Sequence, residues 1–260
     1  MTFGFVGTGT ITEAIIRGMR SAGMDEPIVV SPRNGEIAAR LAADLADVSI
    51  AGDNQEVVDR ANTVVLAVRP QIVQQVVGEL RFRAEQTVVS LVATLGMAEL
   101  AEMVAPASSL VRAVPLPFVE HRLGPTLVYP HHPEIVALFD RLGKAIVLSE
   151  ESQIDVMTAA SSTMGAYFAT MGWITDWLSK GGIDETLARS YMSTMWFGLA
   201  DAAQRHPERD FPTLSREYST AGGLNEQLKT GLENEGVGEL YARGLDAIVE
   251  RVRKGAKGRG

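Results

Sequence analysis

The first half of the chain alternates short apolar runs with amphipathic stretches. The runs are rich in Val, Ile, Leu and Ala, as is typical of parallel strands covered on both faces. They predict strands at residues 3–7, 28–31, 48–50, 63–68, 87–92 and 110–114, with two more at 125–129 and 145–148. Helical patterns fall between them, at residues 11–22, 36–45, 54–60, 72–80, 97–103 and 133–142. Such alternation with short connections predicts an α/β fold with a doubly wound parallel sheet.

Beyond about Ser149 the strand-like runs stop and long helical patterns continue to the end of the chain. Residues 156–175 contain no charged side chain, a length that would span a bilayer. Six Ser and Thr residues and acidic flanks without a basic anchor favour a buried helix of a soluble protein instead. A helix that is apolar on all faces needs cover on all sides, and a domain of about 110 residues hardly supplies it. We therefore expect these helices, including a second one at 184–203, to pack against a partner subunit.

Composition and charge narrow the function classes. The 260 residues carry a formal net charge of −8, so the chain has no long-range attraction for nucleic acid. There is no cysteine, which removes disulfides, thiolate nucleophiles and cysteine-ligated metals and fits a reducing, cytoplasmic location. The first residues show no secretory signal. The four histidines have no ligand spacing, and no G-x-S-x-G or P-loop is present, so no metal, hydrolase or P-loop site is expected.

The strongest motif joins the first predicted strand to the first predicted helix and reads Gly7-Thr8-Gly9-Thr10-Ile11. Gly7 allows a tight turn, and Gly9 lets a pyrophosphate approach the backbone N–H groups at the helix N-terminus. The third position of the G-x-G-x-x-G fingerprint is Thr12 in place of Gly or Ala. Because the motif opens a strand–helix–strand unit, it predicts a Rossmann-like dinucleotide site.

The end of the second predicted strand indicates which dinucleotide binds. Sites that prefer NAD place an acidic residue here, which bonds the ribose 2′-hydroxyl. This chain has Ser31-Pro32-Arg33-Asn34, and a guanidinium with a hydroxyl suits a 2′-phosphate that a carboxylate would repel. We therefore predict NADPH (NADP⁺) as the cofactor, with NADH less favoured. The alternative for Arg33 is a solvated side chain in a turn.

With these motifs, the chain resembles the pyrroline-5-carboxylate reductase family, in the 6-phosphogluconate-dehydrogenase-like group. The opening GFVGTGTITEAI is similar to the nucleotide turn of that family, and Asn54 stands where the family has an Asn near the adenosine ribose. The segment 64–71 resembles its LAVKPQ segment, whose backbone passes under the cofactor, with Arg69 for the common Lys. The cofactor-binding residues expected from motif and resemblance are Gly7, Thr8, Gly9, Thr10, Ile11, Ser31, Arg33, Asn34, Asn54, Ala67, Val68, Arg69 and Pro70.

In the segments that resemble the substrate-binding part of the family, several residues differ from the family's motifs. Residues 219–225 are similar to the TSPGGTT loop of the family, which holds the substrate carboxylate, but Leu224 and Asn225 replace the two Thr. Leu116 replaces the Asn of its R-x-M-P-N-T-P loop, and residues 158–167 resemble its TALSGSGPAY helix start. The substrate-binding residues that the resemblance implies are Ser161, Thr163, Gly222, Gly223 and Leu224.

The resemblance implies an NADPH-dependent reductase that converts 1-pyrroline-5-carboxylate to L-proline, in proline biosynthesis. The cofactor supplies the hydride, and a protonated imine accepts it without a general base, so a polar group near the nitrogen is enough. Asn225 is the candidate for that contact. Two alternatives are a related imine or 3-hydroxyacid oxidoreductase, and a catalytically silent NADP-binding regulator.

Three segments are expected along the chain. Residues 1–149 form the NADP-binding Rossmann-like domain, residues 150–254 form a helical dimerisation and substrate domain, and residues 255–260 form a disordered tail. The expected partners are a small imine or amino-acid substrate and a second copy of the chain, as a homodimer through the C-terminal helices or a larger oligomer. Neither nucleic acid nor a membrane is expected as a partner.

Overall fold

The computed structural model describes residues 1–257, and its contacts divide the chain into two units. The first unit comprises residues 1–158 together with the chain from Glu250 onward, and the second comprises residues 159–249. Residues 150–158, which the sequence analysis assigns to the helical domain, thus pack with the first unit. Ile154 is buried, and Glu151 forms an ion pair with Arg112.

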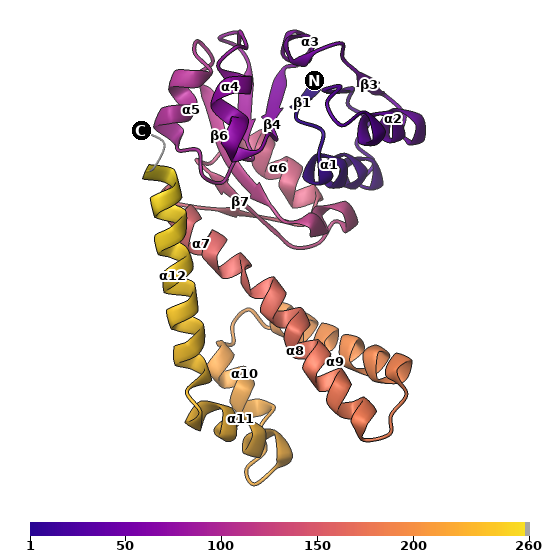
Figure 1. The fold of residues 1–260 in the computed structure, drawn as a ribbon, viewed down its shortest axis with the longest axis vertical. Coiled ribbons are helices and arrows are strands. Elements are labelled where there is room, and N and C mark those ends of the chain that lie inside the picture. Colours follow the sequence, from indigo (N-terminus) through magenta and orange to yellow (C-terminus); the bar gives the residue numbers. More distant parts are fainter. Residues whose placement is uncertain (258–260) are drawn as a thin grey trace. The chain divides into compact units, whose positions relative to one another are not determined.

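An eight-stranded sheet forms the centre of the first unit (Figure 1). Its strands run in the order β3-β2-β1-β4-β5-β6-β7-β8. They are β1 (Phe3–Val6), β2 (Ile28–Val30), β3 (Val48–Ile50), β4 (Thr63–Leu66), β5 (Thr87–Ser90), β6 (Ser109–Pro115), β7 (Pro125–Tyr129) and β8 (Lys144–Val147). Each overlaps a predicted strand, and the predicted α/β fold is confirmed. The order reverses between β1 and β4, and a crevice at such a switch point is where open α/β sheets bind ligands.

One pair of strands departs from the predicted parallel sheet. β6 and β7 are antiparallel, with Arg112 opposite Tyr129. The connection between them holds only the short 3₁₀ helix η2 (Pro117–His121). A parallel pair needs a crossover of a dozen or more residues, so this short connection returns the chain in the opposite direction.

Helices cover both faces of the sheet (Figure 1). One face carries α1 (Thr10–Ser21), α2 (Gly35–Asp44) and α6 (Pro133–Arg141), which bury side chains such as Ile15, Leu41 and Phe139 in one core. The other face carries α3 (Asn54–Arg60), α4 (Val73–Val77) and α5 (Met97–Met103), with Val57 and Leu100 in a second core. Full burial of a Leu, Ile or Phe side chain contributes about 1.5–3 kcal/mol, so these two cores hold the sheet rigid beneath the strand ends.

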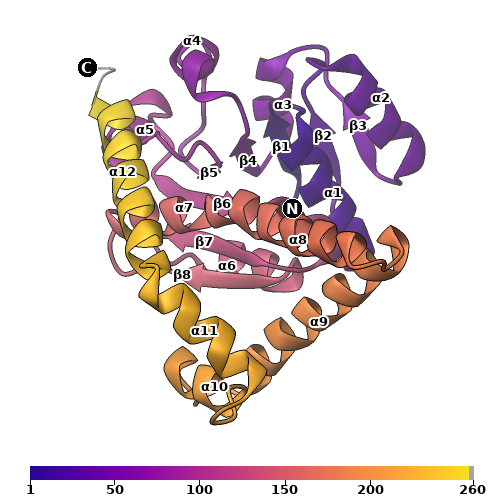
Figure 2. The same cartoon turned by 60° about the horizontal axis from the view of Figure 1, so that its bottom comes forward.

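The remaining helices are α7 (Gln153–Ser161), α8 (Thr163–Lys180), α9 (Glu185–Arg205), α10 (Phe211–Glu217), α11 (Leu224–Asn234) and α12 (Val237–Lys257). In the second unit α8 and α9 pack side by side (Figure 2). The uncharged stretch predicted as one buried helix is divided at Ser162, and α8 contains no buried residue. The second unit by itself therefore does not bury α8, and the cover that the sequence analysis expects from a partner subunit stays a prediction.

The end of the chain also differs from the expectation. α12 continues to Lys257, so residues 255–257 of the predicted disordered tail are helical, and residues 258–260 lie outside the described part. Among the described residues, no helix combines the length and the apolar character that a membrane span requires.

Candidate active site

The turn between β1 and α1 is shaped by two glycines with different surroundings. Gly7 has a φ of +102°, and a Cβ there would lie 2.6 Å from the Ala67 carbonyl oxygen, so only glycine fits. A Cβ on Gly9 would meet nothing within 4 Å. Thr12 is fully buried and donates its hydroxyl to the Gly7 carbonyl at 2.7 Å, which closes the turn. Thr12, which stands at the third glycine position of the fingerprint, therefore adds a hydrogen bond to the turn and leaves the space beside Gly9 open.

The N-terminus of α1 offers unpaired backbone donors beside this open space. Its N-cap, Gly9, provides no side-chain hydrogen bond, so the first N–H groups of the helix remain free to face an anion. The one acidic residue of the first turn, Glu13, is held by Arg40 and Arg17. The Arg40 hydrogen bond, ahead of the Arg17 contact, lowers the pKa of Glu13. Its negative charge is thus offset locally and does not cancel the positive end of the helix dipole.

Ser31, expected to bind the cofactor phosphate, instead uses its hydroxyl inside the turn. It is fully buried, its oxygen accepts the Gly7 N–H at 3.0 Å, and it lies 3.1 Å from the Thr8 hydroxyl. The Thr8 hydroxyl in turn donates to the Ser31 carbonyl at 2.7 Å. These bonds fasten the end of β2 to the β1–α1 turn, so Ser31 positions the turn.

The predicted cofactor residues converge at the switch point of the sheet. A cavity of about 230 Å³ there is lined by ten of them, namely Gly7, Thr8, Gly9, Ser31, Arg33, Asn34, Asn54, Ala67, Val68 and Arg69. Thr10, Ile11 and Pro70 do not line it, and Ile11 packs against the core below. Ile72 and Val76 complete the lining and were not predicted. Both are half-buried apolar residues one turn apart at the start of a predicted helix, and that spacing was their only signal in the sequence.

Two arginines give the rim of this cavity its charge. Arg33 follows β2, Arg69 follows β4, and both side chains are exposed. Within the part of the chain that the structure describes, neither guanidinium has a hydrogen-bond or ion-pair partner. Arg17, Arg40 and Arg60, by contrast, are paired with carboxylates. A chain with net charge −8 thus keeps two free cations at one cavity, which suits a ligand with several phosphates.

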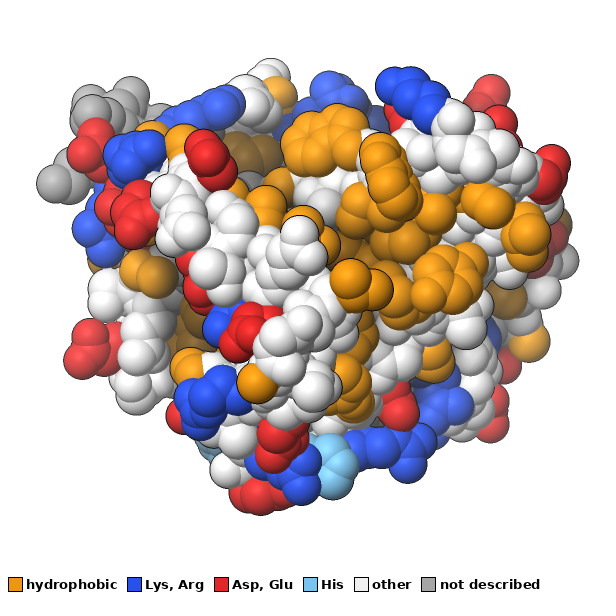
Figure 3. Space-filling model, turned by 90° about the horizontal axis from the view of Figure 1, so that it is seen from below, with side chains coloured by type: hydrophobic (Ala, Val, Ile, Leu, Met, Phe, Trp, Pro, Cys, Tyr) orange, Lys and Arg blue, Asp and Glu red, His pale blue; other side chains and the backbone are white. Residues whose placement is uncertain are grey.

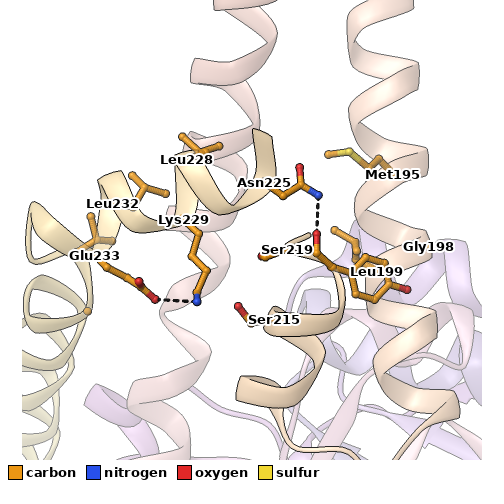
Figure 4. Close-up of a pocket in the computed structure, with 13 residues that line it drawn as sticks. Met195, Gly198, Leu199, Ser215, Ser219, Asn225, Leu228, Lys229, Leu232 and Glu233 are labelled. Carbon is orange, nitrogen blue, oxygen red and sulfur yellow. Dashed lines mark hydrogen bonds and ion pairs between the residues drawn. The ribbon is translucent and has the colours of Figure 1, made fainter. Parts of the chain in front are cut away.

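The second unit has its own cavity, of about 790 Å³, between α9, α10 and α11 (Figure 4). Its walls are mostly apolar and include Met195, Leu199, Leu228 and Leu232. Asn225 lies at its edge, with Nδ2 donating to the Tyr218 carbonyl at 2.7 Å. No other hydrogen bond to the Asn225 side chain occurs in the described residues, so its Oδ1 stays free to accept one.

The loop before α11 already uses the donors expected to hold a substrate carboxylate. The Gly222 N–H donates to Glu226 Oε2 at 2.6 Å, and the Gly223 N–H donates to the Thr220 carbonyl at 2.8 Å. Leu224 is 84% exposed and does not line the cavity. The chain therefore presents neither glycine N–H to a ligand in this conformation.

The other two predicted substrate residues lie elsewhere in the second unit. Ser161 ends α7, and Thr163 begins α8 with its hydroxyl bonded to the Ala160 carbonyl at 2.8 Å. Neither lines the cavity beside Asn225. Across the described residues, no group of three or more His, Asp or Glu is placed to hold a metal ion.

Comparisons with known proteins agree with this division of the chain. Residues 2–94 match a family model described as NADP oxidoreductase, coenzyme F420-dependent. Residues 151–255 match a model described as pyrroline-5-carboxylate reductase dimerisation. Together the two models cover the nucleotide cavity and the helices of the second unit.

Relatives that align over nearly the whole chain bear the name that also appears in the second family model. The chain is 29% identical over 259 residues to pyrroline-5-carboxylate reductase of Pseudomonas aeruginosa, covering 95% of this chain and 94% of that protein. A solved pyrroline-5-carboxylate reductase from Coxiella burnetii aligns with a TM-score of 0.85 and 25% identity, over 98% of this chain and 97% of that one. The Plasmodium falciparum pyrroline carboxylate reductase, solved with NADP bound, aligns with a TM-score of 0.83 and 17% identity over 98% of both chains.

Proposed function

We propose that the chain is a member of the pyrroline-5-carboxylate reductase family and that it reduces 1-pyrroline-5-carboxylate to L-proline with NADPH. It is an NAD(P)H-dependent oxidoreductase that acts on a C=N bond. The observation that carries the proposal is the first cavity, where a glycine turn, a helix N-terminus and two unpaired arginines converge.

The residues of this cavity fit NADPH. The open space beside Gly9 leaves room for the pyrophosphate to approach the free N–H groups of α1. Arg33, at the end of β2, is placed for the 2′-phosphate, and Asn54 for the adenosine ribose. Ile72 and Val76 add an apolar wall for a ring. When bound, the cofactor supplies the hydride, and this chain's residues hold and orient it.

Asn225 is the proposed catalytic contact. Its amide N–H is bonded to Tyr218, so the carbonyl oxygen is the group it offers, and an oxygen acceptor complements the N–H of a protonated imine. That contact keeps the proton on the ring nitrogen while the hydride adds to the adjacent carbon. The C=N π bond breaks, its electrons remain on nitrogen, and the product is a secondary amine. No base is needed before this step.

The assay that tests the function follows the loss of NADPH absorbance with 1-pyrroline-5-carboxylate. We expect turnover by the wild-type chain, with NADPH preferred over NADH. Asn225→Ala is expected to lower kcat/KM about 10-fold, as for loss of a hydrogen bond to a charged group. Asn234→Ala, at the exposed end of the same helix, is the matched control and should keep full activity.

Tight NADPH binding without turnover of any imine would support a silent regulator and overturn the proposal. Oxidation of a 3-hydroxyacid with NADP⁺ in preference to reduction of every imine with NADPH would point to another oxidoreductase of the same group. Full activity of Asn225→Ala would remove Asn225 from the mechanism while leaving the reaction intact.

We also propose that the chain works as a homodimer through the second unit. Many large apolar side chains of the second unit are exposed, among them Phe168, Trp173, Trp177, Tyr191 and Phe197. Figure 3 shows hydrophobic side chains gathered on the face that it presents. Exposed apolar patches of this kind mark interaction surfaces, and the dimerisation model covers these helices. The cysteine-free composition and the reliance on NADPH support a cytoplasmic location as part of the same proposal.

Trp177 is the best single residue with which to test the dimer. It lies on α8 and is 71% exposed, so a charge there costs little in the isolated chain and much in a buried interface. Trp177→Glu is expected to weaken self-association at least about 30-fold, as for loss of an aromatic hot spot. Leu123→Glu, 58% exposed in the first unit, is the control. Light scattering after gel filtration measures both, and an unchanged mass for Trp177→Glu would contradict the proposal.

A further inference from the structure

The cavity between α9, α10 and α11 has one polar side on otherwise apolar walls (Figure 4). Asn225 and Lys229 line it from α11, and Ser215 and Ser219 line it from α10 and the loop that follows. Neither serine hydroxyl has a hydrogen-bond partner among the described residues. The N-cap of α11, Gly223, provides no side-chain hydrogen bond, so the first N–H groups of that helix are free as well. Hydrogen-bond donors therefore predominate on this side of the cavity.

Lys229 supplies the positive charge of this polar side. Of the described residues that line the cavity, only Lys229 and Glu233 are charged, and Lys229 Nζ lies 3.5 Å from Glu233 Oε1 (Figure 4). The Glu233 side chain is 61% exposed and that of Lys229 is 37% exposed, so water screens the carboxylate more than the ammonium. Exposed pairs of this spacing are weak, so a ligand carboxylate can replace Glu233 as the partner of Lys229.

The position of Lys229 on α11 brings its charge close to Asn225. The two residues are four apart in one helix, so they lie on the same face of it, about 5–6 Å apart at Cβ. The flexible four-carbon stem of lysine lets the ammonium turn from Glu233 toward a group beside Asn225. In 1-pyrroline-5-carboxylate the carboxylate is attached to the carbon next to the ring nitrogen. A ring whose nitrogen contacts Asn225 Oδ1 therefore keeps its carboxylate within reach of Lys229.

We propose that Lys229 is a specificity-determining residue, whose positive charge selects cyclic imines that carry a carboxylate over the same rings without one. The inference rests on the proposed imine reduction at Asn225. A carboxylate beside Asn225 gains a charge-assisted hydrogen bond from the Lys229 ammonium, with Ser215 and Ser219 as further donors on the same wall. A protonated ring without a carboxylate is a cation, and the same ammonium repels it. Lys229 thus has opposite effects on the two kinds of substrate.

The test compares 1-pyrroline-5-carboxylate with 1-pyrroline, the same ring lacking the carboxylate, in the full-length enzyme with NADPH. Lys229→Met keeps most of the length of the side chain and removes its charge. It is expected to lower kcat/KM for the carboxylated imine about 10-fold, through KM, as for loss of a hydrogen bond to a charged group. For 1-pyrroline, kcat/KM should stay the same or rise about twofold, because a repulsive charge has been removed. If 1-pyrroline is not turned over measurably, its inhibition constant takes the place of kcat/KM.

Three further variants and a change of salt complete the comparison. Lys229→Arg keeps the charge and should retain kcat/KM for the carboxylated imine within about threefold. Glu233→Gln removes the competing carboxylate and should raise that value about twofold. Lys144→Met removes one positive charge at an exposed position of the first unit and should alter neither substrate. A higher ionic strength should raise KM for the carboxylated imine in the wild-type chain and much less in Lys229→Met.

The outcomes separate this inference from the proposed function. A wild-type chain that oxidises NADPH with neither imine overturns the proposed function itself. Equal losses with both imines in Lys229→Met, or no loss with either, overturn the role of Lys229 and leave imine reduction in place. Thermal unfolding of each variant checks the fold, and Lys229→Arg and Glu233→Gln decide the matter if Lys229→Met is unfolded.

Discussion

Gly9→Val is expected to weaken NADPH binding about 100-fold, or about 2.7 kcal/mol, while the chain remains folded. The backbone at Gly9 has φ −107° and ψ −172°, an extended conformation that valine adopts readily. Its side chain would meet no protein atom within 4 Å of the new Cβ, so it would fill the space through which the pyrophosphate approaches. The loss of glycine at the N-cap of α1 costs at most about 1 kcal/mol of stability.

Gly7→Ala provides the contrasting variant two residues earlier. At Gly7 the φ is positive, and an added Cβ would lie 2.6 Å from the Ala67 carbonyl oxygen, so alanine would strain the folded backbone. We therefore expect a loss of about 2 kcal/mol or more in unfolding free energy. Titration calorimetry with NADPH and urea unfolding distinguish the two variants. A Gly9→Val protein with unchanged NADPH affinity would show that the cofactor does not use this turn.

The largest effect on stability is expected at the ion pair between Arg112 and Glu151. Arg112 Nη1 donates to Glu151 Oε1 at 2.5 Å, and Nη2 donates to the Ala93 carbonyl at 2.6 Å. The same Glu151 oxygen accepts the Met97 N–H at 2.7 Å. The Arg112 side chain is only 5% exposed, whereas that of Glu151 is 35% exposed. The pair joins β6, the loop after β5 and the start of α7.

Because the two side chains are buried to different extents, the two single variants should lose different amounts of unfolding free energy. Glu151→Ala leaves a buried guanidinium without a counter-charge and frees the Met97 N–H, which should cost about 3–5 kcal/mol. Arg112→Met leaves a carboxylate that water still reaches and that keeps its bond to Met97, so a loss of about 1–2 kcal/mol is expected. The double variant should be no less stable than Glu151→Ala alone, because the two residues act as a pair.

Urea unfolding of the three variants measures these losses, with Glu150→Ala, its exposed neighbour, as the control. Equal losses for Glu151→Ala and Arg112→Met would contradict the assignment of the cost to the buried guanidinium. A smaller loss for Glu151→Ala than for Arg112→Met would do so more strongly.

The local pattern of apolar and polar residues was sufficient to predict most strands and helices of the first unit. Every strand was predicted because buried parallel strands leave continuous apolar runs, and the turn at Gly7 and Gly9 is contained in nine residues of sequence. Four loops at the carboxyl ends of β1, β2, β3 and β4 then meet at one edge of the sheet, which is why Arg33, Asn54 and Arg69 converge with the glycines. The antiparallel direction of β7 was not predicted, since strand direction depends on how the connection packs.

The substrate side was less predictable, because its chemistry depends on which polar atoms are already paired. The sequence indicates a Gly-Gly loop at a helix start. It does not indicate that Glu226 accepts a hydrogen bond from the Gly222 N–H. Likewise Ser31 is a plausible phosphate ligand by residue type, but its hydroxyl is used between Gly7 and Thr8. Hydrogen-bond partners are settled by geometry within about 3 Å, which residue type alone does not specify.

By itself, the sequence determined the α/β fold, the place of the dinucleotide turn, the resemblance to pyrroline-5-carboxylate reductases, and a second half of helices with apolar faces. These properties follow from periodicity and from residues close together in the chain, where local physics suffices. Only the tertiary structure decided which donors remain free, which charges are paired across long separations such as the 39 residues between Arg112 and Glu151, and how exposed α8 stays within one chain. Those properties arise when distant segments meet and compete for the same hydrogen-bond partners and for burial away from water.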